Sequence, residues 1–264
     1  MTKRLEDKVA VVLGAAGKGN MAQVIARRFA AEGAKVVVGG RHEQELKRFA
    51  DELGGRHTVC DITQKADVEA LAATAIDAFG KVDVAVNCTG WGLLAKLLDT
   101  TGEQIDKLTA LQFKGPYFFL QVFVEAMRSA GGSIIQISSA SRFALLENHA
   151  AYIGTKAGGD ALVRCFANEF GRFGIRINSI APGLTASPMT EQAIGMPGLE
   201  AAFLREYPLG RIGTSEDIAN AAVWLATDES FMTGQVLQIN GGLTLRRNPT
   251  QSEINASMKA AASK

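Results

Sequence analysis

The stretch Val9-Ala10-Val11-Val12-Leu13-Gly14-Ala15-Ala16-Gly17-Lys18-Gly19-Asn20-Met21-Ala22 places an apolar run directly before a glycine-rich segment. Small residues leave room for the backbone to approach a pyrophosphate, and a following helix offers its N-terminal amides to the negative charge. A glycine-rich turn is also compatible with a plain tight turn, but its position after the first strand of a βαβ unit favours dinucleotide binding. We expect the contacts to come from Gly14, Gly17, Lys18, Asn20 and Met21.

Outward from this stretch, short β-branched runs alternate with helical patterns along the chain. The expected strands are residues 9–13, 35–39, 57–60, 82–87, 133–138, 176–181 and 236–240. The expected helices lie near residues 21–32, 43–53, 64–79, 102–128, 151–173 and 215–226. Such alternation builds right-handed βαβ units. We therefore predict an α/β fold, a doubly wound parallel sheet (Rossmann fold) in a single domain, with ligands at the carboxyl ends of the strands.

The bulk properties fit one domain, which we expect to span residues 1–245, followed by a polar tail at 246–264 whose structure stays open. The 264 residues carry a formal net charge of +1 without a large charge block, so no nucleic-acid partner is expected. No apolar run is long enough to span a bilayer and no signal-peptide core is evident, which favours a cytoplasmic protein without a membrane partner. The three widely spaced cysteines form no metal-ligand pattern.

A second motif combines two hydroxyls and an ammonium. Tyr152 and Lys156 are one helical turn apart on the same helix face. Ser139 lies 13 residues before Tyr152, at the end of an apolar run that is typical of a buried parallel strand. A free tyrosine hydroxyl titrates near ~10, and a nearby ammonium favours the phenolate and lowers that pKa. Ser139, Tyr152 and Lys156 are therefore the candidate catalytic residues around one substrate oxygen.

Together, the glycine-rich loop and the Ser139, Tyr152 and Lys156 spacing resemble the short-chain dehydrogenase/reductase family over about residues 5–243. The resemblance implies that Tyr152 is the general acid in reduction and the base in oxidation. It also implies that Lys156 lowers the Tyr152 pKa and binds the cofactor ribose, and that Ser139 donates to the substrate carbonyl. Tyr152 and Lys156 thus count as cofactor contacts as well.

The glycine-rich loop departs from the family's common Gly-x-x-x-Gly-x-Gly spacing. Its run from Gly14 to the next helix is longer, and Asn20-Met21-Ala22 stands where the family's enoyl reductases carry Ser-Ile-Ala. The catalytic spacing does not resemble that branch, because those enzymes separate the tyrosine and the lysine by six residues and this chain separates them by three.

The end of the second expected strand indicates which cofactor is bound. Cofactors with a free adenine-ribose diol usually meet an acidic residue at this position. Here Gly39 and Gly40 stand instead, followed by Arg41, whose guanidinium suits a phosphate. An exposed loop arginine without a ligand is the plain alternative. We predict NADP (NADPH), with Arg41 at the 2′-phosphate and Lys18 as a second cation.

The resemblance implies further cofactor contacts after the later strands. Asp61 resembles the family's adenine-contacting acid, although it could equally cap the next helix. Asn87 would brace the sheet, and a Pro-Gly turn would cap the nicotinamide. The remaining positions implied are Ile62, Gly90, Pro182, Gly183, Leu184 and Thr185. Gln112 stands where the family often has the asparagine of a proton relay, so its role stays open.

Residues 188–210 resemble the family's variable substrate lid, which we expect to close over an apolar pocket. The pocket candidates are Trp91, Phe143, Leu145, Met189 and Phe203. Packing of the lid onto the body is the alternative for about half of such residues. Apolar residues on more than one side of the helices at 102–128 and 151–173 would leave an exposed patch in a monomer. The resemblance implies a homotetramer or homodimer paired through these helices.

The sequence therefore predicts an NADP-dependent oxidoreductase that interconverts a ketone and a secondary alcohol of an apolar small molecule. An enoyl reductase is the first alternative, on the loop spacing. A nucleotide-binding scaffold without catalysis is the second, against which the complete Ser139, Tyr152 and Lys156 set argues. A cofactor-free halohydrin lyase is the third and resembles the chain less, because such enzymes carry arginine in place of the lysine. The sequence leaves the substrate, the direction and the stereochemistry open.

Overall fold

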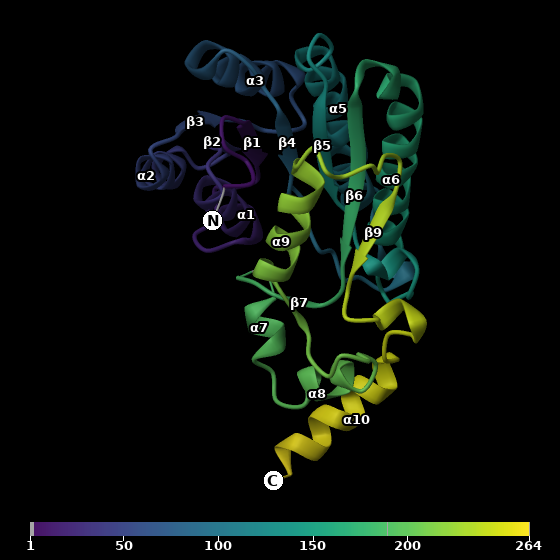
Figure 1. The fold of residues 1–264 in the computed structure, drawn as a ribbon. Helices are drawn as coiled ribbons and strands as arrows, with labels where there is room; N and C mark the ends of the chain where they lie inside the picture. The colour runs from purple at the N-terminus through teal and green to yellow at the C-terminus, as the bar shows by residue number, and fades with distance from the viewer. Residues whose placement is uncertain (1–2, 189, 264) are drawn as a thin grey trace.

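The computed structural model describes residues 3–188 and 190–263, and these form one seven-stranded parallel sheet flanked by helices (Figure 1). The sheet order is β3-β2-β1-β4-β5-β6-β9, so the strand order reverses between β1 and β4. The strands are β1 (Val9–Leu13), β2 (Lys35–Gly40), β3 (Arg56–Val59), β4 (Val84–Asn87), β5 (Gly132–Ile137), β6 (Ile175–Pro182) and β9 (Val236–Ile239). The prediction of a doubly wound parallel sheet in a single domain is confirmed.

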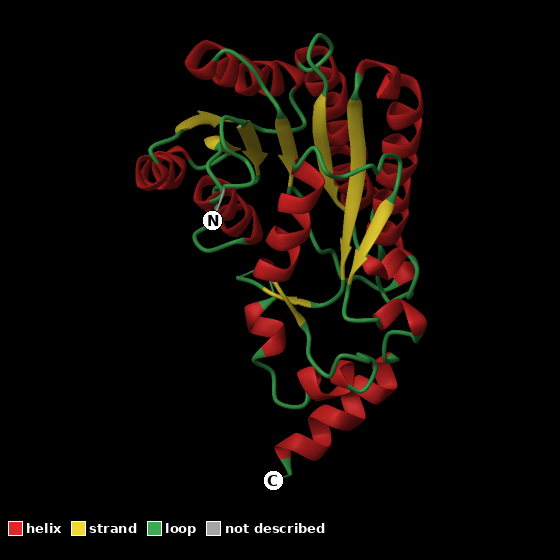
Figure 2. Cartoon of the chain, in the orientation of Figure 1, coloured by secondary structure: helices red, strands yellow, loops and turns green. Residues whose placement is uncertain are grey.

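Helices cover both faces of the sheet, as apolar strands on both sides require (Figure 2). One face packs against α1 (Met21–Ala31), α2 (Glu43–Leu53) and α9 (Ser215–Ala226). The other face packs against α3 (Lys65–Phe79), α5 (Gly115–Ala126) and α6 (Ala150–Phe170). These bounds agree closely with the hydrophobic periodicity, except in the helix expected over 102–128.

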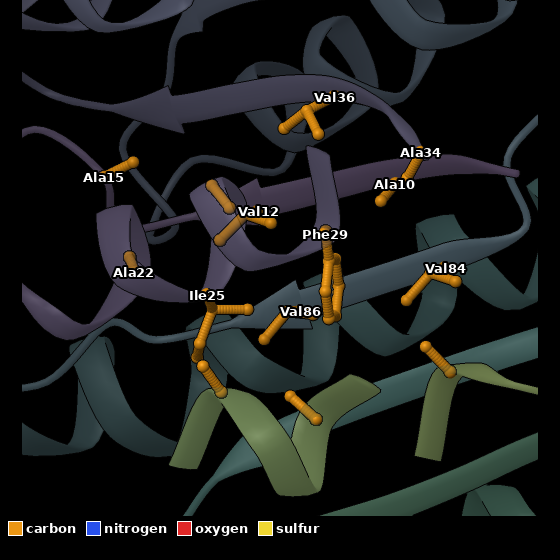
Figure 3. Packing of buried hydrophobic residues seen from close by; sticks show 14 of the residues in the cluster. Ala10, Val12, Ala15, Ala22, Ile25, Phe29, Ala34, Val36, Val84 and Val86 are labelled. Carbon is orange, nitrogen blue, oxygen red and sulfur yellow. The ribbon is translucent and has the colours of Figure 1, made fainter. Parts of the chain in front are cut away.

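The core under α1 fixes the first crossover, which carries the glycine-rich loop. Val12, Val36 and Val86 come from three neighbouring strands and face Ile25 and Phe29 of α1 (Figure 3). Ile25, Phe29 and the strand residue Val12 are fully buried. Removal of such side chains from water contributes roughly 1.5–3 kcal/mol each. The end of β1 and the start of α1 are therefore held rigidly against each other.

The helix expected over 102–128 is divided in two by a wider turn. It consists of α4 (Gly102–Thr109), a π-helical turn η2 (Ala110–Lys114) and α5. Pro116 stands at the start of α5 and has no amide hydrogen, so it cannot make the α-helical bond to the carbonyl of Gln112. A π-helical turn accommodates this loss and rotates Gln112 into the protein, where it is 2 % exposed.

Several short elements lie beyond the carboxyl edge of the sheet, at the lower end of the molecule in Figure 1. They are β7 (Thr185–Ala186), α7 (Glu191–Ile194), α8 (Leu199–Leu204), β8 (Gly213–Thr214) and α10 (Gln251–Ala262). The tail, whose structure the sequence left open, thus contains a helix. Within residues 3–188 and 190–263, no helix is long and apolar enough to cross a membrane.

Candidate active site

The glycine-rich loop between β1 and α1 lies directly on the end of β4. Gly14 has a φ of +105°, and an ideal Cβ there would lie 3.1 Å from the carbonyl carbon of Cys88. Glycine is therefore required at this close approach. Asn20 caps α1, since its Oδ1 accepts from the amide of Gln23 at 3.0 Å and its Nδ2 donates to the Gly14 carbonyl at 2.8 Å. The loop is anchored at both ends and leaves Lys18 exposed.

The three candidate catalytic residues meet at the carboxyl edge of β5. Ser139 follows β5, and Tyr152 and Lys156 lie in the first two turns of α6. Ser139 Oγ shares a hydrogen bond of 2.8 Å with Ser141 Oγ, and it is close enough to Tyr152 to oppose the rise of the Tyr152 pKa. The Lys156 ammonium lies 5.8 Å from the centre of the Tyr152 ring and donates to the carbonyl of Ile137 at 2.7 Å. The strand and the helix thus place two hydroxyls and a cation around one point.

Burial governs the protonation of this group. Burial raises the pKa of Tyr152 above its usual value, and the hydrogen bond with Ser139 opposes that shift. Burial lowers the pKa of Lys156 to about 8, and the charge of Asp160 opposes it. Desolvation has the largest effect on the Tyr152 pKa in this arrangement, where the lysine donates to a backbone carbonyl, and the lowering of that pKa by Lys156 stays a prediction. Tyr152 is accordingly a neutral acid at pH 7.

Gln112, whose role the sequence left open, links two parts of the site. Its Oε1 accepts from the amide of Trp91 at 2.9 Å, and its Nε2 donates to Thr155 Oγ1 at 2.8 Å. An ideal Cβ on Gly90 would lie 3.3 Å from the same Oε1 and 3.5 Å from the Lys156 ammonium. The Gln112 amide therefore ties the loop after β4 to α6, and Gly90 lies against Gln112 and Lys156.

Asn87 braces the sheet, as the resemblance implies. Its Nδ2 donates to Gln136 Oε1 at 2.8 Å, which links β4 to β5. Gln136 Nε2 is buried and has no partner among the described residues. It borders a polar cavity of roughly 20 Å³, enough for one water molecule. Lys156 and Asp160 line the same cavity.

A buried ion pair beside Lys156 was missed by the sequence analysis. Asp160 lies one turn after Lys156 and is 2 % exposed. Its Oδ2 accepts from Ser138 Oγ at 2.7 Å and from Arg142. The Arg142 guanidinium also lies 4.2 Å from the centre of the Phe143 ring. The periodicity placed Asp160 on α6, but nothing in the sequence indicated that Arg142 would fold back onto it from the turn after Ser139.

The adenine-side candidates divide into two groups. Arg41 is exposed at the end of β2, where the 2′-phosphate is expected. Asp61 instead forms a local turn, since its Oδ1 accepts from the amide and the hydroxyl of Thr63 at 2.9 and 2.8 Å. Ile62 is 2 % exposed and packs against Gly115, so its side chain belongs to the core.

Tyr207, in the segment predicted as a lid, holds the turn after β6. The Leu184 amide, expected to be offered to the cofactor, donates to Tyr207 Oη at 2.6 Å. The Thr185 hydroxyl donates to the Gly183 carbonyl at 3.0 Å. Pro182 ends β6, so the turn from Pro182 to Thr185 lies at the carboxyl edge of the sheet. The Leu184 amide and the Thr185 hydroxyl both have hydrogen-bond partners within the protein.

The predicted pocket residues do not all face one space. Phe143 and Leu145 are 48 % and 68 % exposed. Trp91 is half-buried, with the Lys107 ammonium 4.4 Å from its ring centre. Phe203 is 7 % exposed and packs in a cluster with α10, so it stabilises the lid rather than lining an open surface. Met189 lies outside the described residues.

His149, to which the sequence assigned no role, lies against Tyr152. Its ring centre is 4.7 Å from that of Tyr152. Burial lowers the pKa of His149. A lone histidine before a helix carries no sequence signal of such a contact.

Comparisons with known proteins find relatives that match almost the whole chain. A family model described as enoyl-(acyl carrier protein) reductase matches residues 14–244. An uncharacterised oxidoreductase of Mycobacterium bovis is 37 % identical over 92 % of this chain and 99 % of its own length. Trans-4-hydroxycyclohexanecarboxylate dehydrogenase of Sinomonas cyclohexanicum is 34 % identical over 95 % of this chain and 98 % of its own. A solved short-chain type dehydrogenase/reductase from Mycobacterium ulcerans superposes with a TM-score of 0.90 at 28 % identity, covering 97 % of this chain and 98 % of that one.

Proposed function

The chain belongs to the short-chain dehydrogenase/reductase family of oxidoreductases, and we propose that it interconverts a ketone and a secondary alcohol with NADP(H). Members of the family bind a nicotinamide dinucleotide. The residues present fit such a cofactor, because the loop leads into the N-terminus of α1 with open space at Gly19, and Lys156 lies at the same carboxyl edge. The observation that carries the proposal is the convergence of Ser139, Tyr152 and Lys156 beside this loop.

Each catalytic residue has a role that follows from its surroundings. Ser139 donates a hydrogen bond to the carbonyl oxygen and positions it next to Tyr152. Tyr152, kept protonated by burial, gives its proton to that oxygen during reduction. Lys156 supplies positive charge that stabilises the phenolate left behind. When bound, the nicotinamide exchanges a hydride with the substrate carbon.

The charges around the end of β2 support NADP over NAD. No carboxylate stands at Gly39 or Gly40, and Arg41 is exposed with no ion-pair partner among the described residues. The nearby Glu45 is already engaged, since its carboxylate accepts from Arg48 and Gln23. Arg48 and Gln23 hold the Glu45 pKa near 2. The cationic side chain at 41 is therefore available to a 2′-phosphate.

A cofactor comparison tests this assignment. A charge-assisted hydrogen bond contributes roughly 1.5–3 kcal/mol, so Arg41 should favour NADPH over NADH by about tenfold to a hundredfold. We expect the ratio of kcat/KM for NADPH over NADH to fall by that factor in Arg41→Ala. A parent enzyme that prefers NADH would overturn the proposal. An unchanged ratio in the variant would move the discrimination to Lys18 or His42.

The substrate class follows from the apolar surroundings of Ser139. Phe143 and Leu145 are exposed in the segment that follows it, and the Trp91 amide donates to Gln112 in the loop after β4. The relative named trans-4-hydroxycyclohexanecarboxylate dehydrogenase supports a hydroxylated ring as one type of substrate. A panel of cyclic ketones and alcohols, followed by NADPH absorbance, tests the class.

An enoyl reductase is the second candidate, because the matching family model carries that description and the glycine-rich loop resembles that branch. The three residues between Tyr152 and Lys156 argue against it. Turnover of a crotonyl thioester with NADPH, without turnover of any ketone, would favour this candidate over a carbonyl reductase.

A further inference from the structure

In the polar C-terminal segment, a complete capping box begins the helix α10. After β9 the chain makes a 3-10 turn, η5 (Leu243–Leu245), and then reaches α10 beyond the carboxyl edge of the sheet (Figure 1). Thr250 caps α10, since its Oγ1 accepts from the amide of Glu253 and the Glu253 carboxylate accepts from the Thr250 amide at 2.7 Å. Arg247 holds the same carboxylate through two bonds of 2.7 Å. The segment is therefore a fixed structural element.

This segment binds the loop that follows Ser139. Asn248 is 7 % exposed, and its Nδ2 donates to the carbonyl of Ala144. The amide of Gln251 donates to Glu147 Oε2 at 2.9 Å. That amide belongs to the first turn of α10, where a carboxylate is favoured by the helix dipole. Two contacts thus fasten residues 144–147 to the start of α10.

The other side of the segment binds the lid. Gly198 precedes α8 with a φ of +83°, and an ideal Cβ there would lie 2.4 Å from the Ser257 carbonyl oxygen. The lid backbone therefore lies directly against α10, at a distance that only glycine permits. Ile254 is 7 % exposed and shares a cluster with Ala202 and Phe203 of α8.

Taken with the proposed function, on which this inference rests, these contacts assign a role to the tail. We propose that residues 247–258 determine substrate specificity by clamping the loop at 143–147 to the lid helix α8. The loop presents Phe143 and Leu145, the exposed apolar side chains next to Ser139. With the clamp in place, loop and lid hold the apolar part of a bulky ketone or alcohol. Cofactor binding and proton transfer depend on β1, β5 and α6, which the segment does not touch in these contacts.

Two point variants in the full-length chain test the clamp from its two sides. Asn248→Ala removes the bond to the loop, and Ile254→Ala leaves a void under α8. We expect the KM for 2-tetralone to rise at least tenfold in each, because a loosened clamp no longer holds a bulky ring. The KM for acetone, the kcat for both ketones and the Kd for NADPH should stay within threefold of the parent. Lys259→Ala, on the exposed side of the same helix, is the matched control and should change none of these values.

Hydrogen exchange gives a readout that does not need turnover. Amides at 143–147 and 199–204 should exchange at least tenfold faster in both variants, and those of β1 should not change. An unchanged KM for 2-tetralone in both variants overturns the proposal. So does an NADPH Kd that rises by the same factor as the KM, which indicates general destabilisation. If the parent turns over no ketone or alcohol, the proposed function fails, and the hydrogen-exchange rates alone test the clamp. Faster amide exchange in both variants then supports the clamp, and unchanged exchange refutes it.

Discussion

Asp160→Asn is the perturbation that most directly tests the electrostatics around the catalytic lysine. The substitution preserves the shape of the side chain and removes its charge. In the parent, Asp160 is 2 % exposed and accepts from both Ser138 and Arg142. The Arg142 side chain is 23 % exposed, so it would stay charged and partly buried without its partner. The variant therefore measures what an unpaired guanidinium costs at this position.

The expected loss of stability follows from the burial of Asp160 and Arg142. Neutralising one member of a buried ion pair costs about 3–5 kcal/mol, and the partial exposure of Arg142 places this pair at the lower end, about 3 kcal/mol. For a chain of 264 residues the unfolding entropy is about 0.55 kcal/mol/K, so the melting temperature should fall by about 5 °C. Thermal unfolding of the cofactor-free protein at neutral pH measures this shift.

The same variant should change the pH dependence of catalysis. Burial lowers the Lys156 pKa to about 8, and the Asp160 carboxylate works against that shift. Without the carboxylate, the Lys156 pKa falls further, and the ammonium is lost at a lower pH than in the parent. The alkaline limb of kcat/KM for ketone reduction should therefore move to lower pH, which a profile from about pH 6 to 10 measures.

An exposed ion pair supplies the control for both measurements. Glu125→Gln removes a partner of Arg128, with the two side chains 71 % and 52 % exposed. Such surface pairs contribute about 0–1 kcal/mol, so the melting temperature should change by no more than about 2 °C. If Asp160→Asn melts with the parent and keeps its pH profile, Asp160 neither pairs with Arg142 nor supports the Lys156 charge.

Two further predictions concern catalysis and assembly. Tyr152→Phe should lower kcat by ~10²–10⁴ while the Kd for NADPH is unchanged, and a variant with full turnover on a proven substrate would refute the assignment of the proton donor. We also propose pairing of two copies through α5 and α6, since Phe113 of the adjoining turn η2 and Tyr117 of α5 are exposed at 38 % and 40 %. Ala161→Arg on the exposed side of α6 should then yield monomers in light scattering at micromolar concentration, whereas Ala66→Arg on α3 should not. A monomeric parent would contradict the pairing.

The sheet could be predicted from the sequence because its strands are apolar on both faces. Runs such as Val9–Leu13 leave no polar face for solvent, and this pattern fits a buried parallel strand. The π-helical turn at Ala110–Lys114 could not be predicted in the same way. Pro116 removes one α-helical bond, but the wider turn is also held by bonds from Gln112 to Trp91 and Thr155, which are distant in sequence. Hydrophobic periodicity continues through such a turn without a break and therefore predicts one helix.

The position of the candidate catalytic residues could be predicted from the sequence because topology alone brings them to one edge of the sheet. Ser139 follows a central strand and Tyr152 begins the next helix, so the carboxyl edge must hold both. Topology did not predict which side chains surround these residues. Arg142 reaches Asp160 only because the 3-10 turn η3 (Ala140–Arg142) reverses the chain after Ser139. The contact of His149 with Tyr152 likewise depends on side-chain packing that no spacing rule encodes.

The two glycines that end β2 are closely packed, which the sequence did not indicate. The sequence indicates only that no acid stands there. In the structure, an ideal Cβ on Gly39 would lie 2.9 Å from Leu71, and one on Gly40 would lie 2.7 Å from the Cβ of Ala16 in the glycine-rich loop. An acidic residue at position 40 would therefore displace the loop expected to hold the pyrophosphate. Packing alone disfavours a diol-binding acid at this site, and Arg41, the first residue after β2, is exposed to solvent.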